Sequence, residues 1–194
     1  MAHTPWQDVL DFWFLPPGEA GHLRARREWF EKNPAFDALV AERWTGLVER
    51  AGAGGLTDWE AGPEGALARI VLLDQFPRNI WRDTPRAFSL DGEALAAALR
   101  LLERGGDRAL APMQRVFAYL PLEHAEDLAM QERAVALFRE LAGQAPETAG
   151  NLDYAVRHRD VIARFGRFPH RNRILGRAGT PQETAFLAQP GSGF

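Results

Sequence analysis

Several residue types and sequence features are missing, and each absence limits what the protein can be. The 194 residues include no cysteine, so disulfides and thiolate metal ligands are excluded. Lysine occurs only at Lys32 among 23 lysines and arginines, which we interpret first as codon usage and only second as function. No uncharged apolar run approaches membrane-spanning length, because even residues 66–73 are interrupted by Arg69. We therefore expect no membrane partner.

Length and charge narrow the class of protein further. The first 14 residues have no basic start and carry Asp8 and Asp11, so we expect no signal peptide and a cytoplasmic protein. A hydrophobic content of 46% over this length suits one domain, which we place at 1–194. The net charge of −3 and the pI near 6.0 argue against a general nucleic-acid binder. RNA binding through the arginines and phenylalanines of 157–177 is a weaker alternative.

Helix signals recur along the whole chain. Proline-led starts and apolar residues at spacings of three and four predict about eight or nine helices with short links. No segment alternates as a strand requires, so the expected fold is all-α, a stack of helical hairpins. We also expect a short helix over 24–32, and a helix from Pro112 that Pro121 breaks. The expected core includes the aromatic residues Trp6, Trp13, Phe36 and Trp44.

The segment 153–177 is the richest in functional side chains, with seven arginines, two histidines and two acids. Residues up to Phe165 have an apolar face at helical spacing, and His158 falls on that face. Gly166 offers the positive φ that often ends a helix, and Pro169 prevents helix at the residue before it. A shaped loop is therefore predicted after the helix.

This loop holds the main candidates for a site. We predict that Arg167 binds an anionic group, because an arginine supplies a two-donor fork for an oxyanion. We predict that His170 is the leading acid–base group, kept neutral by its neighbouring arginines. The alternative is structural, since arginines after a helix end cap its carbonyls and complement its dipole. The ligand-binding candidates of this segment are Arg164, Arg167, Arg171 and Asn172.

Asp74 is the most informative acid. It continues an apolar helical face, where an unpaired carboxylate is costly to bury. We expect an arginine partner, either Arg78 or Arg164. A catalytic role and a buried ion pair that fixes helix register are equally compatible with this position.

A faint internal similarity links two loops. The sequence QFPRN at 75–79 resembles RFPHRN at 167–172, and both follow an apolar helix. Unless the similarity is coincidence, the two loops face each other across a shared pocket. Arg78 and Asn79 are then further candidates for ligand binding.

The segment 123–132 carries four acids and no lysine or arginine, opposite in charge to the arginine-rich segment. Blocks of opposite charge attract, so we expect the two segments to pack together. Glu123 and His124 would then be available for general acid–base chemistry. The alternative is a solvated first helical turn, which is the preferred interpretation for Glu126 and Asp127.

Metal and cofactor motifs are not found. No HExxH or paired ExxH pattern occurs, and nearby arginines disfavour a cation. No P-loop, GxGxxG or GxSxG sequence occurs either, so we expect no cofactor. The residues of suitable type for a metal, a use that we disfavour, are Asp74, Glu123, His124, His158 and His170.

Four motifs carry a resemblance that covers nearly the whole chain. They are VLDFWF at 9–14, LDQFPRN at 73–79, YLPLEH at 119–124 and RFGRFPHRN at 164–172. With these motifs the sequence resembles a bacterial family known as domain of unknown function family 924. The resemblance implies an all-helical, TPR-like superhelix and no established activity. One departure is Ala125, where similar proteins are expected to have serine, which weakens any scheme with a hydroxyl at that position.

Two classes of function remain open from the sequence. The first is a binder of, or an enzyme acting on, a small anionic ligand with a carboxylate or phosphate group, held by arginines. The second is a TPR-like protein-interaction module without catalysis. The polar residues gather at helix ends rather than along one face of successive helices, which favours the first. Whether the protein is an enzyme is left open at this stage.

Overall fold

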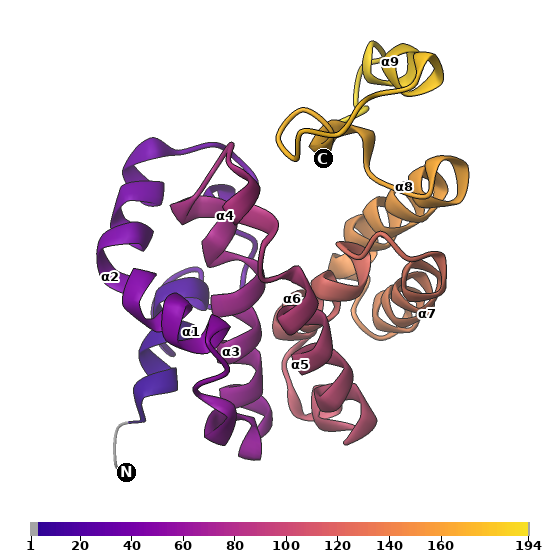
Figure 1. Cartoon of the computed structure of the whole chain (residues 1–194). Coiled ribbons are helices and arrows are strands. Elements are labelled where there is room, and N and C mark those ends of the chain that lie inside the picture. Colours follow the sequence, from indigo (N-terminus) through magenta and orange to yellow (C-terminus); the bar gives the residue numbers. More distant parts are fainter. Residues whose placement is uncertain (1–3, 194) are drawn as a thin grey trace.

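The computed structural model describes residues 4–193, and every regular element in that range is a helix (Figure 1). The expectation of an all-α fold is thereby confirmed. Met1–His3 and Phe194, which belong to the expected single domain 1–194, lie outside the described residues. The α-helices are α1 (Pro5–Phe14), α2 (Pro34–Gly52), α3 (Pro63–Asp74), α4 (Phe76–Ile80), α5 (Asp91–Glu103), α6 (Pro112–Glu123), α7 (Leu128–Gln144), α8 (Ala149–Phe165) and α9 (Pro181–Leu187). Single turns of 3-10 helix lie in the links, among them Arg27–Trp29, Thr57–Ala61, Pro85–Phe88 and Pro169–Arg171.

Local signals explain where these helices begin and end. The Asn33 side chain accepts hydrogen bonds from the backbone NH groups of Ala35 and Phe36 at the start of α2. Proline occupies the first turn of α1, α2, α3, α4, α6 and α9, where its missing NH costs no helical hydrogen bond. Gly166 ends α8 with φ of 68°, the left-handed conformation predicted for it.

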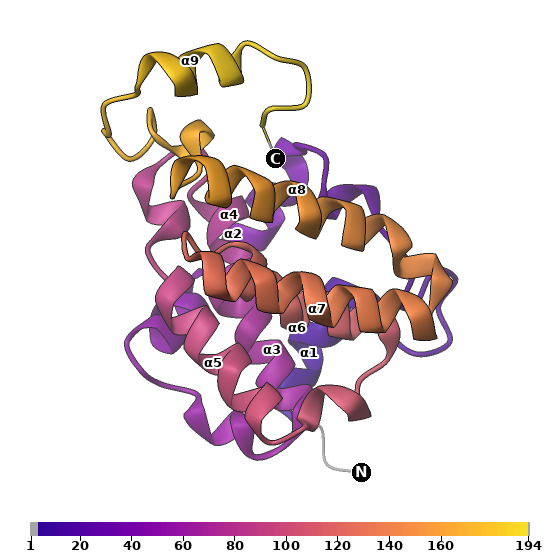
Figure 2. The same ribbon diagram turned by 90° about the vertical axis from the view of Figure 1, so that its right-hand side faces the viewer.

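Helix α3 lies at the centre of the N-terminal part, and its residues 65–74 are all buried. It packs against α1, α2, α5 and α6, whereas α7 and α8 form a pair beside α6 (Figures 1 and 2). The short α9 lies beyond the end of α8. The C-terminal end of α3 therefore reaches a point close to α4, α6 and the loop after α8.

The aromatic residues fix this end of α3. Trp13, Phe36 and Trp44 are buried as expected, whereas Trp6 is only partly buried against the same core. Phe76 is the first residue of α4, and the centroid of its ring lies 5.4 Å from that of Trp13. Contacts of this kind are stronger than their buried area alone implies, so the junction between α3 and α4 is held firmly.

Two local expectations were wrong. Helix α6 does not break at Pro121 but continues to Glu123, and the His124 NH closes the last turn on Leu120 O at 2.8 Å. Proline removes one donor of the helix, and tertiary packing around a buried Pro121 outweighs that loss. The helix expected over 24–32 is a single 3-10 turn, because the Arg26 guanidinium is bound to the carbonyls at the end of α1.

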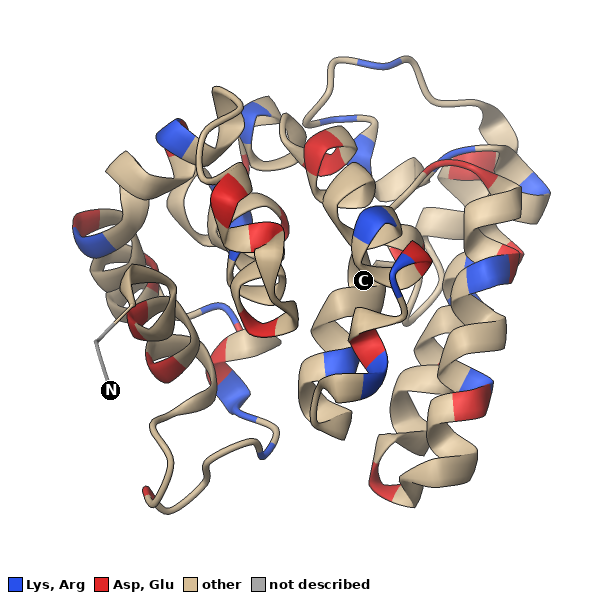
Figure 3. Cartoon of the chain, turned by 90° about the horizontal axis from the view of Figure 1, so that it is seen from below, with Lys and Arg blue, Asp and Glu red and all other residues tan. Residues whose placement is uncertain are grey.

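Lysines and arginines are interspersed with acids along the helices, as the ribbon seen from below shows (Figure 3). No helix within residues 4–193 is both long enough and apolar enough to cross a bilayer. The single domain and the TPR-like superhelix remain predictions.

Candidate functional site

A buried polar cluster lies where α3, α4 and α6 meet. Asp74, at the end of α3, has no exposed surface. Its Oδ1 lies 2.7 Å from Nδ1 of His124, and its Oδ2 accepts a hydrogen bond of 2.5 Å from Gln75 Nε2. Arg78 Nη2 lies 3.7 Å from the same Oδ1. Three groups therefore compensate a carboxylate that would be very costly to bury alone.

Charge and tautomer at this pair follow from their surroundings. Burial alone would raise the pKa of Asp74, but His124, Arg78 and Gln75 outweigh it and lower the pKa to about 2. Burial, assisted by Arg78, lowers the pKa of His124 below its usual value despite the nearby carboxylate. At neutral pH the pair is thus a carboxylate and a neutral imidazole. Because a carboxylate only accepts, Nδ1 carries the proton, and Nε2 is left as a base.

The two similar segments meet at Asp91, the first residue of α5, although residues 76–79 belong to helix α4 and not to the expected loop. Arg78 donates from Nη1 and Nη2 to the Asp91 carboxylate, at 2.9 and 3.2 Å. Arg171, from the loop after α8, donates from Nη1 to Asp91 Oδ2 at 3.3 Å. The guanidiniums of Arg78 and Arg171 also lie over the ring of Phe88, at 5.6 and 4.8 Å from its centroid. Two arginines far apart in sequence thus share one carboxylate.

Arg171 is the least compensated cation of the cluster. It is only 6% exposed and lies between the rings of Phe88 and Phe168, with its Cζ 4.5 Å from the Phe168 centroid. Its Nε is buried and has no hydrogen-bond partner in the structure. Burial and the neighbouring Arg78 lower the pKa of Arg171 to about 10. A further anion beside Arg171 would therefore be stabilised.

A second acid–histidine pair lies behind the first. Glu123 is 3% exposed, and its Oε1 lies 3.0 Å from Nδ1 of His158, a nitrogen that is also 2.9 Å from Tyr154 O. Burial, together with Asp74, raises the pKa of Glu123 to about 8. Burial lowers the pKa of His158 to about 3. Glu123 is therefore a neutral carboxylic acid at pH 7, and His158 is a neutral imidazole.

His170 belongs to the same electrostatic environment. Burial, and next Arg171, lowers the pKa of His170 to about 4, and His124 contributes in the same direction. The expectation that neighbouring arginines favour its neutral form agrees with this direction, although burial is the larger cause. The cluster is least buried beside the first pair, where the side chains of Arg78, Asp91 and His124 keep 21%, 20% and 16% of their surface exposed.

Other predicted site residues lie elsewhere. Asn79 Nδ2 donates to Asp37 Oδ1 at 2.8 Å, which ties α4 to α2. Arg164 lies over the rings of Phe165 and Phe186, so the expectation that it pairs with Asp74 was wrong. The Asp74 partner is Arg78, the other arginine that the sequence suggested.

Arg167 and Asn172 both lie close to Glu183 in the C-terminal segment. Arg167 forms a fork with Glu183, with Nε–Oε1 and Nη2–Oε2 distances of 2.6 and 2.8 Å. Hydrogen bonds from Arg167 and from the Thr180 backbone lower the pKa of Glu183 to about 2. This contact occupies the two-donor fork that we expected to hold an anionic ligand, so Arg167 has no part in the function proposed below.

The acidic and basic segments do pack together. Glu126 is exposed, as expected, but it also accepts hydrogen bonds from the Phe168 NH at 2.7 Å and from both Nη atoms of Arg177, at 2.6 and 2.9 Å. Asp127 matches its expected role, since its side chain accepts from the Met130 NH at the start of α7. Glu126 therefore anchors the loop that carries Arg171.

Sequence reasoning missed three contributors to the cluster. Asp91 resembled an ordinary acid in a first helical turn, and Phe88 an ordinary loop residue. Gln131 Nε2 donates to the carbonyls of Glu123 and Ala125, at 2.5 and 2.7 Å, and so holds the end of α6. The apolar spacing around His158 indicated its burial, but nothing indicated its partner. Within residues 4–193 no three histidines or acids are arranged to hold a metal ion.

These features define a class: an all-α protein with a buried aspartate–histidine–arginine cluster at the junction of its helices. The chain belongs to the family of bacterial proteins of unknown function DUF924, which matches residues 9–191. It is similar to a solved structure of a protein of unknown function, ATU0120 from Agrobacterium tumefaciens. The two are 40% identical, with a TM-score of 0.83 over 94% of this chain and 96% of the other. A search of curated proteins found no match.

Proposed function

We propose that the cluster around Asp74 binds a small anion with a carboxylate or phosphate group, and that His124 is its acid–base group. The observation that carries this proposal is the contact between Asp74 and His124. A fully buried carboxylate fixes the imidazole orientation and tautomer, which leaves Nε2 unprotonated and able to accept a proton. The imidazolium that forms after proton uptake would be stabilised by the same carboxylate.

Arg171 supports the anionic character of the ligand. Its guanidinium is held rigidly between two rings, shares Asp91 with Arg78, and has an unpartnered Nε. Bidentate binding of an oxyanion would supply the missing acceptor and compensate the buried charge. In this arrangement the arginine positions the ligand, and His124 accepts a proton from it or from a water beside it.

Glu123 adds a proton donor to this proposal. Because its pKa is raised to about 8, it holds a proton in the range where His124 is neutral. Two neighbouring groups with opposed protonation states are the usual arrangement of an acid and a base at one site. Glu123 is thus the candidate acid of the cluster, with His158 as its partner.

The alternative of a protein-interaction module has no specific support. The large hydrophobic side chains exposed among the described residues belong to five separate segments of the chain: Phe30, Leu39, Leu128, Tyr154 and Leu187. A docking surface would need a contiguous apolar patch.

The test is stabilisation by inorganic phosphate and by acetate, measured as the free energy of unfolding with and without the anion. At a hundred times its dissociation constant, a bound anion stabilises the wild-type protein by about 2.7 kcal/mol. Arg171→Gln should lose this stabilisation, whereas Arg139→Gln, an exposed arginine on α7, should keep it. Equal stabilisation of Arg171→Gln and wild type, or no stabilisation of wild type by either anion, contradicts the proposal.

A further inference from the structure

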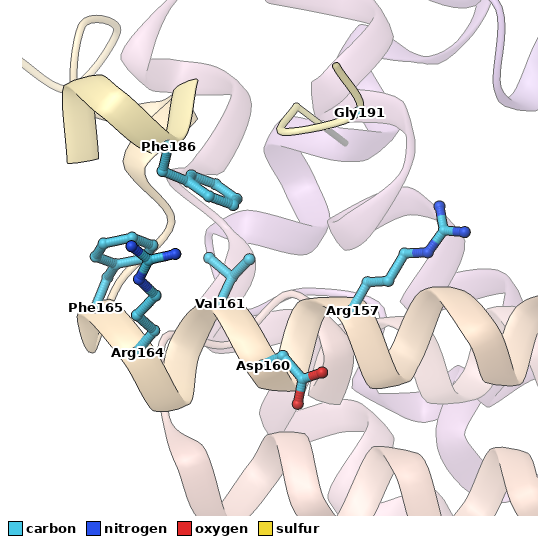
Figure 4. A pocket seen from close by; sticks show the side chains of 7 residues that line it. All are labelled: Arg157, Asp160, Val161, Arg164, Phe165, Phe186 and Gly191. Carbon is cyan, nitrogen blue, oxygen red and sulfur yellow. The ribbon is translucent and has the colours of Figure 1, made fainter. Parts of the chain in front are cut away.

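A separate pocket of about 230 Å³ lies on the outer side of α8, next to α9 and the C-terminal segment. It is lined by Arg157, Asp160, Val161, Arg164, Phe165, Phe186 and Gly191 (Figure 4). The buried cluster around Asp74 contributes none of these residues. The pocket is therefore a second place where the molecule could hold a ligand.

The floor of this pocket is apolar. Val161 is buried on α8, and Phe165 and Phe186 lie 5.2 Å apart between ring centroids. Figure 4 shows Val161 pointing toward the Phe186 ring, which comes from α9. These side chains form a small apolar surface of their own, apart from the main core. Apolar surface left open beside a concave site favours binding of a group of similar size.

The charge of the pocket is positive. Arg157 and Arg164 make ring contacts, over Tyr154 for the first and over Phe165 and Phe186 for the second, and neither forms an ion pair within residues 4–193. The carboxylate of Asp160 is bound by Arg159 Nε at 2.7 Å and points away from the Phe186 ring (Figure 4). Two guanidiniums therefore flank an apolar floor, and the one carboxylate of the lining, Asp160, is paired with Arg159 rather than with either of them.

We propose that this pocket binds a monocarboxylate whose apolar part is about the size of one ring. Arg164 is the residue placed to hold the carboxylate, because its guanidinium is already fixed in position by the rings of Phe165 and Phe186. The apolar group would lie on Val161 and Phe186. A volume of 230 Å³ is below the range of roughly 300–1,000 Å³ that drug-sized ligands need, which limits the ligand to a small acid.

The experiment uses 4-fluorobenzoate as the probe, followed by fluorine NMR, with 4-fluorobenzamide as its uncharged counterpart. We expect saturable binding of the acid to wild-type protein and binding at least about tenfold weaker for the amide, the effect of one lost charged hydrogen bond. Arg164→Gln should weaken binding of the acid by a similar factor. Arg139→Gln, an exposed arginine on the neighbouring helix α7, is the matched control and should bind as wild type does.

Other measurements separate this site from the cluster around Asp74. Arg171→Gln should leave 4-fluorobenzoate binding unchanged, and phosphate should not compete with it. If phosphate competes and Arg171→Gln abolishes binding of the acid, the probe occupies the other site and this proposal is wrong. Equal affinity of Arg164→Gln and wild type, or equal affinity for acid and amide, contradicts it as well.

Discussion

The Nδ1 atom of His124 lies 2.7 Å from the Oδ1 atom of Asp74, a carboxylate with no exposed surface. The two residues are 50 positions apart in sequence, and they come from the ends of α3 and α6. Their contact fixes the imidazole tautomer and connects the two helices. The Asp74 carboxylate has both of these roles. A substitution at Asp74 should therefore affect stability and proton transfer together, whereas a substitution at His124 should affect mainly proton transfer.

Replacement of Asp74 by asparagine should destabilise the protein strongly. The change leaves Arg78 and His124 beside a neutral group in a buried environment, and removal of one partner from a buried charge pair costs about 3 kcal/mol or more. Urea unfolding measures the loss. The control is Asp83→Asn, which alters an exposed pair with Lys32 and should leave stability unchanged. Similar stability of the two variants would show that the Asp74 charge has no structural role.

Stability should fall as pH rises from 7 to 8, and Glu123 is the cause. Its pKa in the folded protein is about 8, above the ordinary value of 4.5, so the native state keeps a proton that the unfolded chain has lost. The slope is about 1.4 kcal/mol per pH unit while the native state is fully protonated, and it falls to about half of that at pH 8, where half of the native molecules have lost the proton. Glu123→Gln should remove this slope, as judged from unfolding curves at each pH. A slope that persists in the variant must come from another group.

At acidic pH the dependence of stability on pH has the opposite sign. The pKa values of His158 and His170 are lowered to about 3 and 4, so the unfolded chain binds protons that the native state excludes below pH 6.5. Their contribution to stability is complete above pH 6.5 and is lost as pH falls toward these values. Wild-type stability should therefore be greatest near pH 6.5–7. A maximum below pH 5 would contradict the burial of these neutral imidazoles.

Arg167→Ala should loosen α9 and leave anion binding intact. The fork between Arg167 and Glu183 joins the loop after α8 to the capping box of α9, in which the Thr180 side chain accepts from the Glu183 NH. Hydrogen exchange at the amides of 183–187 should accelerate, whereas Arg133→Ala, an exposed arginine on α7, should have no effect. Unchanged exchange together with loss of phosphate stabilisation would instead support the ligand role expected from the sequence.

The helices could be predicted because their signals are local. Asn33 before Pro34, the Thr180 capping box and the glycine after Phe165 each act within a few residues, and each occurs as expected. Pro121 shows the limit of such rules, since packing around a buried proline carried the helix to Glu123.

The partners of the site could be predicted only in part. The similarity of the segments 75–79 and 167–172 indicated that Arg78 and Arg171 approach each other, but Asp91 lies 13 and 80 positions away from them, and no pattern marked it. Arg167 forms the two-donor fork that the sequence suggested, but its partner is the Glu183 carboxylate rather than a ligand. Long-range pairing of this kind depends on the packing of helices, which sequence spacing does not specify.

The central claim is that His124 is a neutral base, oriented by Asp74, beside a site for an anion. Long-range proton–nitrogen NMR of the histidine side chains measures its tautomer and its pKa directly, with His124→Gln identifying the signals. We predict a neutral His124 at pH 7 with the proton on Nδ1, and a shift of the Nε2 resonance on addition of inorganic phosphate. A doubly protonated His124 at pH 7, a proton on Nε2, or a spectrum that phosphate leaves unchanged would contradict the account.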